Sequence, residues 1–346
     1  MYALNKFTFD LKKLLIGQFY LRVQIMLNKF HDCELLFFSP HKNLIPLQLM
    51  LTIDPKTIPV PQLHGYLLGA IGPRPIAFAS TVDKDGNPNL APFSFFNVFS
   101  ANPPILIFSP ARSGRTNTTK DTYNNVKAVK EVVINIVNYD MVHQMSLASS
   151  PFEPNVDEFI KTGFTKVASE TVQPFRVAEA PVQFECIVTE VKELGQDGGA
   201  GNLVFCEVQR IHIAEEILDE NGKIDQHKID LVARMGGNWY CRADKNSMFE
   251  IAKPITTIGI GYDAIPKDIL ESTVLTKNDF GQLGNIETIP DETEVNEYKL
   301  LDLSELFIEF EDDQKTLEIK LHSLAKEKLK ENKVDEAWKT LLSFNN

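Results

Sequence analysis

The sequence predicts a mainly β protein with inserted helices, in which an antiparallel β-barrel is followed by a helical C-terminal appendage. Short apolar runs separated by turn residues recur through the middle of the chain, without the regular strand and helix alternation that indicates a parallel sheet. Near the C-terminal end, leucines recur at helical spacing. The chain has 346 residues, 43% of them hydrophobic, which is enough for one large domain or two modest ones.

Residues 1–49 differ from the rest of the chain. They carry six Lys or Arg against three Asp or Glu, and glutamine and arginine interrupt their apolar stretch at 14–27. The interruptions make that stretch too polar for a membrane span, and no signal-peptide cleavage site follows it. We expect Met50 to be the true start and residues 1–49 to be a non-native or disordered extension. A lineage-specific amphipathic extension is the alternative.

The first predicted hairpin begins with a strand over residues 76–82. Its residues are apolar with a β-branched end, and Asp85-Gly86 beside Asn87-Pro88 supplies the turn. Glycine and asparagine adopt positive φ at little cost, as such turns require. The sequence therefore predicts that a second strand folds back on the first.

Four further strands are predicted, over residues 105–109, 132–137, 182–194 and 203–214. The last two flank the glycine-rich stretch 195–201. A phosphate-binding loop of this kind would be followed by a helix, and none is predicted after Gly201. We interpret the stretch as a hairpin tip, and an antiparallel barrel around a Phe-rich core is favoured over a doubly wound nucleotide domain.

The second strand of the hairpin mixes small polar residues with phenylalanines. Ala91, Ser94 and Asn97 alternate with aromatic residues over 91–99. Close backbone approach, directed hydrogen bonds and an apolar wall suit a flat heteroaromatic ligand with a polar edge. The alternative is a hairpin whose phenylalanines belong to the core.

A candidate phosphate site lies in residues 113–125. A short helix is predicted over 122–129, so free backbone N–H groups should converge near Lys120 and Thr122. The lysine charge, the threonine hydroxyl and the guanidinium of Arg115 would each stabilise a phosphate. An ordinary solvated helix start is the alternative.

Charge and cysteine content exclude several classes of function. The net charge of −12 argues against a nucleic-acid-binding surface. The four cysteines are widely spaced without a C-x-x-C pair, so a metal site is not expected. Cys186 and Cys206 lie in apolar strand patterns and are predicted to be buried thiols, which fits the cytoplasm.

The C-terminal part is predicted to be helical. A helix is expected after Pro266, and acidic loops after Pro290 precede an amphipathic helix over 313–333 and a short helix that carries Trp338. We expect this appendage to dock on its own barrel, with partner binding or dimer wrapping as the alternative.

Several sequence blocks together resemble the flavin reductase-like family of FMN-binding split-barrel proteins, which includes flavoredoxins and NAD(P)H:flavin oxidoreductases. The blocks stand in the family's order and cover roughly residues 51–249. They are PRPIAFASTVDKDGNPNLAPFSFFN from Pro73, a strand after Pro103-Pro104, KDTYNNV from Lys120, DEFIKTGFT from Asp157, FECIV from Phe184, LVFCEVQRIHI from Leu203 and RMGGNWYCR from Arg234. The resemblance implies a split-barrel domain over 50–290 and an acidic helical appendage over 291–346.

The resemblance also implies site residues. The flavin ring and ribityl chain would be held by Thr81, Asn89, Ala91, Ser94, Phe95, Phe96 and Asn97. The phosphate end would be held by Ser109, Arg115, Lys120 and Thr122. Arg234 and Tyr240 would lie at the edge of the flavin pocket or at a subunit contact, the alternative being a strand end held by packing of Trp239. His212 is expected on the nicotinamide side, with a packing role as its alternative.

By this resemblance the chain is expected to be a homodimeric, cytoplasmic oxidoreductase. It would take hydride from NADH or NADPH onto FMN. It would then pass electrons to free flavin or to another acceptor, such as a protein. Hydride transfer to flavin needs no dedicated protein acid or base, so no catalytic side chain is predicted. The alternative is a flavin carrier or storage module without its own NAD(P)H oxidation.

Overall fold

The structure is a computed structural model that describes residues 49–153, 156–251 and 253–345. The expectation for residues 1–49 therefore falls almost entirely outside the described residues. The chain forms two compact units. The barrel unit extends to Ile224 and includes Leu231–Cys241, and the helical unit comprises Asp225–Asp230 and the chain from Arg242 onward. Each unit has its own hydrophobic core and is described by itself.

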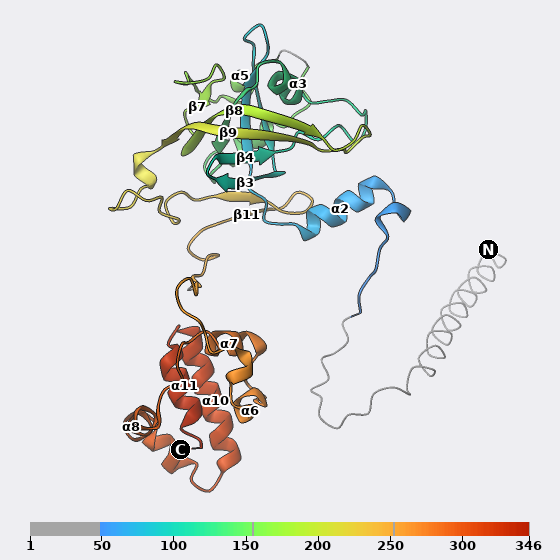
Figure 1. The fold of residues 1–346 in the computed structure, drawn as a ribbon. Coiled ribbons are helices and arrows are strands. Elements are labelled where there is room, and N and C mark those ends of the chain that lie inside the picture. The colour runs from blue at the N-terminus through green and yellow to red at the C-terminus, as the bar shows by residue number, and fades with distance from the viewer. Residues whose placement is uncertain (1–48, 154–155, 252, 346) are drawn as a thin grey trace, which may run out of the picture. The chain divides into compact units, whose positions relative to one another are not determined.

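The barrel unit is built on one antiparallel seven-stranded sheet in the order β2-β1-β5-β8-β9-β4-β3 (Figure 1). Its strands are β1 (Ala77–Val82), β2 (Pro88–Phe93), β3 (Phe96–Ala101), β4 (Pro104–Phe108), β5 (Glu131–Ile136), β8 (Val182–Glu193) and β9 (Asn202–Ile213). Two small two-stranded sheets are formed by β6 (Lys166–Val167) with β7 (Arg176–Val177) and by β10 (Val232–Arg234) with β11 (Tyr240–Arg242). The predicted mainly β, antiparallel architecture is confirmed.

The predicted strands agree with the observed ones to within one residue at each end. The glycine-rich stretch 195–201 joins β8 to β9 as a hairpin, as predicted, because the two strands pair antiparallel from Val182 with Ile213 to Glu193 with Asn202. Alternation is visible on β1, where Ile76 and Phe78 enter one core cluster and Ala77 and Ala79 enter another. Strand β1 is therefore buried on both faces.

The helices of the barrel unit are short. They are η1 (Pro55–Thr57), α2 (Val60–Ala70), α3 (Asp121–Ala128), α4 (Val142–Leu147), α5 (Glu158–Thr162) and η2 (Glu215–Ile217). Asp157 caps α5 by accepting from the Phe159 N–H, and Gly163 ends the helix at a φ of 74° that favours glycine. Phe159 and Phe164 are buried in the same core cluster as Phe78 of β1.

The helical unit has its own apolar core. It contains η3 (Tyr262–Ala264), α6 (Lys267–Leu270), α7 (Lys277–Leu283), α8 (Glu292–Asp302), α9 (Ser304–Glu309), α10 (Gln314–Lys330) and α11 (Val334–Leu342). The predicted amphipathic helix is confirmed by α10, which buries Leu317, Leu321 and Leu329. On α11, Trp338 is fully buried and its Nε1 donates to the Leu283 carbonyl at 3.0 Å. This core therefore joins residues from both sides of position 290.

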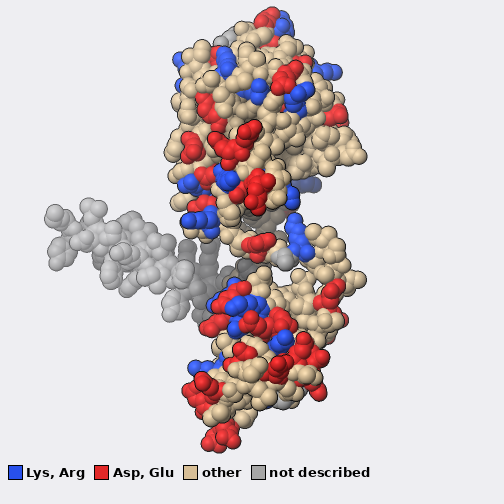
Figure 2. All heavy atoms as spheres, turned by 90° about the vertical axis from the view of Figure 1, so that its left-hand side faces the viewer, with Lys and Arg blue, Asp and Glu red and all other residues tan. Residues whose placement is uncertain are grey.

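The expectation of acidic loops after Pro290 is wrong, because helices α8 and α9 occupy that segment. Asp291 and Glu294 form a reciprocal capping box at the start of α8, so the acidic residues stabilise a helix N-terminus. Figure 2 shows acidic side chains gathered over the helical unit. Residues 285–346 carry sixteen Asp or Glu against eight Lys or Arg.

Among the described helices, none combines the length and apolar character that a membrane span needs. The described residues likewise contain no cluster of His, Cys, Asp or Glu arranged to bind a metal ion. Cys186 and Cys206 are buried free thiols, as predicted, and Cys33 lies outside the described residues.

Candidate functional site

One cavity of the barrel unit lies where β2, the start of α3, α2 and the loop after α4 meet. Its volume is about 350 Å³, within the range of small-molecule sites. We call it the first cavity. It is lined by His64, Leu68, Asn89, Ala91, Pro92, Phe93, Ser94, Phe95, Ser109, Ala111, Lys120, Asp121, Thr122, Ala148, Ser149, Ser150, Pro151, Phe152 and Glu158.

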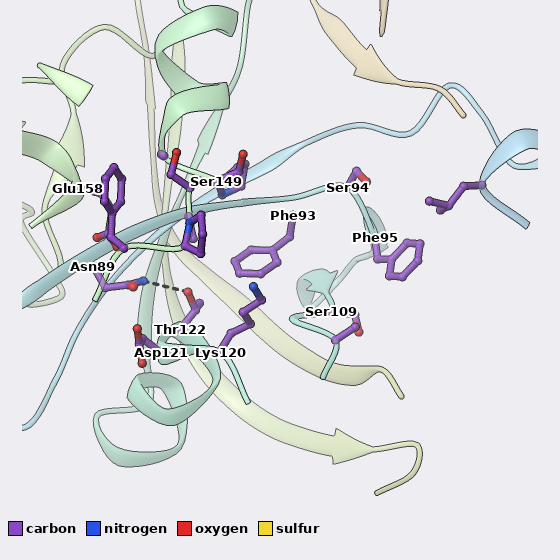
Figure 3. Close-up of a pocket in the computed structure, with 18 of the residues that line it drawn as sticks. Asn89, Phe93, Ser94, Phe95, Ser109, Lys120, Asp121, Thr122, Ser149 and Glu158 are labelled. Carbon is purple, nitrogen blue, oxygen red and sulfur yellow. Dashed lines mark hydrogen bonds between the residues drawn. The ribbon is translucent and has the colours of Figure 1, made fainter. Parts of the chain in front are cut away.

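One end of the first cavity is the N-terminus of α3. The helix starts at Asp121, one residue before the predicted start, and Lys120 occupies the N-cap position without a side-chain cap. The N–H of Asn124 makes the first bond of the helix, to the Lys120 carbonyl at 3.2 Å, so the earlier N–H groups have no intrahelical partner. In the described chain Lys120 has no ion pair, and its side chain reaches toward the ring of Phe93 (Figure 3). This end of the cavity therefore favours an anion.

A hydrogen-bond network fixes this end of the cavity to the sheet. Asn89 Nδ2 donates to Thr122 Oγ1 at 2.9 Å and lies 3.3 Å from Thr81 Oγ1. The same Thr81 hydroxyl accepts from Asn125 Nδ2 at 3.1 Å. Thr81, Thr122 and Asn125 are buried, so strands β1 and β2 and helix α3 are held in one arrangement by polar contacts shielded from water.

The other end of the cavity combines aromatic walls with hydroxyl groups. The ring centroids of Phe93 and the buried Phe108 lie 5.4 Å apart, and those of His64 and Phe95 lie 6.4 Å apart in an edge-on arrangement. Ser94 and Ser109 lie at this end, opposite Asn89 and Thr122 in the view of Figure 3. The cavity thus offers flat apolar surface and a polar rim to the same ligand.

Glu158 places a carboxyl group at the edge of the first cavity. It accepts a hydrogen bond from the Leu90 N–H at 3.0 Å. Burial raises the pKa of Glu158 above its usual value of 4.5, the bond from Leu90 opposes this, and the charges of Asp121 and Asp157 add to the rise. The folded protein therefore holds this carboxyl group in an environment that disfavours its ionised form.

Replacing Glu158 with glutamine is expected to stabilise the barrel unit at neutral pH. A carboxyl whose pKa is raised by folding contributes its stability below pH 4.5 and loses it as the pH rises through the folded pKa. Glutamine can still accept from Leu90 and does not ionise. The thermal midpoints of wild type and E158Q should therefore separate as the pH rises above 4.5. Equal midpoints from pH 4 to pH 8 would contradict this, and Glu190→Gln, exposed on β8, is the control.

Seven of the predicted site residues line the first cavity: Asn89, Ala91, Ser94, Phe95, Ser109, Lys120 and Thr122. Thr81 lies behind them in the polar network. Phe96 packs toward the core, Asn97 is exposed on β3, and Arg115 is exposed in the loop before α3. The cavity therefore brings these seven residues together, although Ser109, expected at the phosphate end, lies at the end opposite Thr122.

Arg234 and Tyr240 line a neighbouring cavity instead. The guanidinium carbon of Arg234 lies 4.5 Å from the centre of the Tyr240 ring. Trp239 is 77% exposed, so the alternative of a strand end held by Trp239 packing is wrong.

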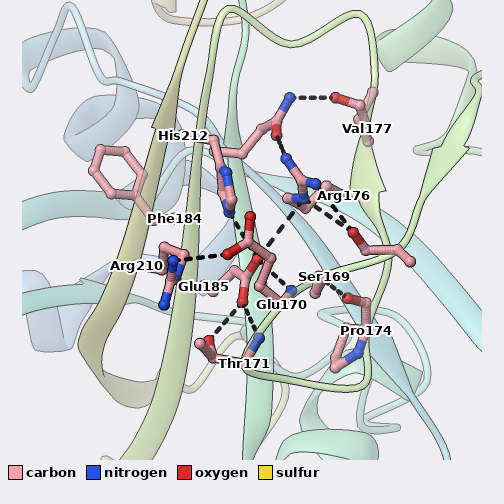
Figure 4. Close-up of polar contacts among 12 residues, drawn as sticks. Ser169, Glu170, Thr171, Pro174, Arg176, Val177, Phe184, Glu185, Arg210 and His212 are labelled. Carbon is pink, nitrogen blue, oxygen red and sulfur yellow. Dashed lines mark hydrogen bonds and ion pairs between the residues drawn. The ribbon is translucent and has the colours of Figure 1, made fainter.

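His212 lies in a separate polar cluster on β8 and β9 (Figure 4). Its Nε2 is 2.8 Å from Oε1 of the fully buried Glu185. Among the described residues, it lines neither the first cavity nor its neighbour.

Sequence reasoning missed the contributions of α2 and of the loop after α4. His64 and Leu68 come from α2, and Ser149, Ser150 and Phe152 come from the loop. The serine pair beside Pro151 has the composition of a ligand-binding loop, but only the fold shows that it faces β2. Glu158 belongs to the block DEFIKTGFT, and its place at the edge of the first cavity depends on where α5 packs.

Comparison with known proteins agrees with this fold. The model of the flavin reductase like domain matches residues 70–228. An uncharacterized protein of Aquifex aeolicus is 38% identical over 181 residues, which cover 52% of this chain and 90% of that protein.

Two solved structures are similar to the barrel unit. Nitrilotriacetate monooxygenase component B from Bacillus cereus gives a TM-score of 0.55 at 31% identity, over 59% of this chain and 99% of that one. The 2-nitrobenzoate 2-nitroreductase of Pseudomonas fluorescens gives a TM-score of 0.54 at 25% identity, over 61% of this chain and 100% of that one. The predicted split barrel is thereby confirmed, and this chain belongs to the flavin reductase-like family.

Proposed function

We propose that this protein binds FMN in the first cavity and acts as an NADH- or NADPH-dependent flavin reductase, passing electrons to free flavin or another acceptor, such as a protein. The observation that carries the proposal is the pairing of an anion-favouring helix start with an aromatic, hydroxyl-lined wall in one cavity of about 350 Å³. The names of both similar structures, a monooxygenase component and a nitroreductase, are those of redox proteins.

The donor set fits FMN. Lys120, the hydroxyl of Thr122 and the first N–H groups of α3 would hold the phosphate. The amide oxygen of Asn89 would accept a hydrogen bond from the ribityl chain, Ser94 would hydrogen-bond the polar ring edge, and Phe93 and Phe95 would cover apolar ring surface. Thr81 acts indirectly, since its hydroxyl orients Asn89.

Bound FMN would supply the group that accepts hydride from a nicotinamide. The task of the protein is then to position the two reactants and to tune the flavin by hydrogen bonds, which requires no dedicated acid or base. The hydrogen bond between Asn89 and Thr122 is buried, so water does not compete for it. Burial raises the pKa of Glu158 next to the proposed phosphate site, and the charge of a bound phosphate would raise that pKa further.

A homodimer in the cytoplasm is part of the proposal. Helix α2 buries none of its residues, and Tyr66 and Leu67 are exposed on it, as are Val98 and Phe99 on β3. Exposed apolar side chains of this size favour a protein partner, and a second copy is the expected one. The described cysteines are all free thiols, which suits a reducing compartment. Light scattering after size exclusion should give twice the chain mass of 39.0 kDa.

An absorbance spectrum of the purified protein tests the function, followed in the same cuvette by anaerobic addition of NADH and then NADPH. Flavin bands that bleach with either donor are expected. Bands that persist with both would favour the alternative, a flavin carrier reduced by another protein. A colourless protein that binds no added FMN would overturn the proposal.

A further inference from the structure

A second cavity adjoins the first one. Its volume is about 370 Å³, and Pro92, Ser94 and Ser149 line both cavities. Ser146, Arg234, Asn238 and Tyr240 add polar groups on its far side. The two cavities are therefore neighbours that share part of their lining.

The guanidinium of Arg234 is held in a defined position at this cavity. The backbone groups of Arg234 and Arg74 exchange two hydrogen bonds of 2.9 Å. Nη2 of Arg234 donates to the Gly237 carbonyl at 2.9 Å, and the guanidinium stacks over the ring of Tyr240. These contacts leave other N–H groups of Arg234 available, because in the described chain they make no hydrogen bond.

A second cation lies beside it. The buried Arg74 donates to the carbonyls of Leu68, Ile71 and Met235, and its Nε has no partner in the described chain. Burial and the neighbouring charge of Arg234 lower the pKa of Arg74. Neither guanidinium has a carboxylate within ion-pair distance among the described residues. Of these two cations, only Arg234 lines the second cavity. The neighbouring charge of Arg74 adds to the attraction of this site for an anion.

We propose that the second cavity is an oxyanion subsite, in which Arg234 binds the phosphate or carboxylate of the reactant that meets the flavin. The inference rests on the proposed function, since it assumes that flavin fills the first cavity. A guanidinium presents a planar fork of donors that matches either oxyanion. The flavin phosphate has its own cation in Lys120, so Arg234 remains for the second reactant.

Two probes distinguish the sources of the anion. ADP-ribose carries the pyrophosphate of a nicotinamide dinucleotide without its reactive ring, and benzoate carries an aromatic carboxylate. Both are titrated calorimetrically into the FMN-loaded full chain. We expect Arg234→Gln to weaken one of them about ten- to a hundredfold, the loss of a charge-assisted hydrogen bond. Weaker binding of ADP-ribose would show that Arg234 binds the phosphate of the nicotinamide donor. Weaker binding of benzoate would show that Arg234 binds the carboxylate of an electron acceptor.

Controls separate binding from folding. Arg210→Gln removes a guanidinium that pairs with Glu170 on the sheet surface and lines neither cavity, so it should leave both probes unaffected. Arg234→Lys keeps the charge without the fork and should retain more affinity than Arg234→Gln. It also tests the subsite if the glutamine variant fails to fold.

Three results would overturn the subsite. The first is that wild type binds neither probe, and the second is that Arg234→Gln binds both normally. The third is that Arg234→Gln loses FMN affinity, which would assign Arg234 to the flavin. If wild type binds no FMN, the proposed function fails, and the same titrations on the flavin-free chain still decide whether Arg234 binds an oxyanion.

Discussion

The double variant Lys120→Ala, Thr122→Ala is expected to bind FMN about a hundredfold more weakly than wild type, from one charge-assisted and one neutral hydrogen bond lost at the phosphate. Lys120 is the N-cap residue of α3 and has no ion pair in the described chain. Thr122 is buried, and its oxygen accepts from Asn89, so the hydroxyl hydrogen remains free to donate to a ligand.

The measurement is the dissociation constant of FMN, from quenching of flavin fluorescence during titration. Thr122→Ser keeps the hydroxyl and should retain most of the affinity, whereas the alanine also leaves Asn89 Nδ2 short of a partner. Lys192→Ala removes an exposed lysine of β8 that lines neither cavity, and it controls for net charge. Wild-type affinity in the double variant would remove the phosphate assignment.

Glu185→Gln is expected to destabilise the barrel unit by about 3 kcal/mol, as loss of one partner from a buried ion-pair network does. The Glu185 carboxylate is fully buried and accepts from the Glu170 N–H at 2.9 Å, the Thr171 N–H at 2.6 Å and the Thr171 hydroxyl at 2.5 Å. His212 and Arg176 approach the same carboxylate, at 2.8 Å and 3.7 Å (Figure 4). In Glu185→Gln, an NH₂ group replaces one carboxylate oxygen and faces N–H or O–H groups that need an acceptor.

Because the chain has two compact units, the stability lost in Glu185→Gln is best measured locally. We would follow it by hydrogen exchange of peptides from β8, β9 and residues 168–177. Faster exchange there and unchanged exchange in the helical unit are expected. Glu190→Gln on the exposed face of β8 is the matched control. Unchanged protection of these peptides would show that the network adds nothing to stability.

The effect of Glu185 should depend on pH. Burial alone raises the pKa of Glu185, but the hydrogen bonds from Thr171, Glu170 and His212 outweigh it and lower the pKa to about 2. A carboxyl whose pKa is lowered by folding contributes its stability above its ordinary value of 4.5 and loses it as the pH falls toward 2. The difference between wild type and E185Q should therefore shrink below pH 4.5.

The sequence was most informative where local chemistry decides structure. The turn at Asp85-Gly86, the glycine-rich hairpin at 195–201 and the leucine spacing of α10 each act over a few residues, and their predictions agree with the structure. The acidic helix α8 was missed because high charge was weighed above the capping box that starts it.

Sequence by itself determined the family, the antiparallel strands and the β2 and α3 residues of the first cavity, because these lie in contiguous blocks whose chemistry is local. Only the tertiary structure decided that α2 and the loop after α4 complete that cavity, and that Arg234 faces a second cavity instead. Such placements depend on contacts between residues far apart in the chain, as when the backbone of Arg74 pairs with that of Arg234. No local pattern specifies those contacts, because the packing of the whole sheet sets their register.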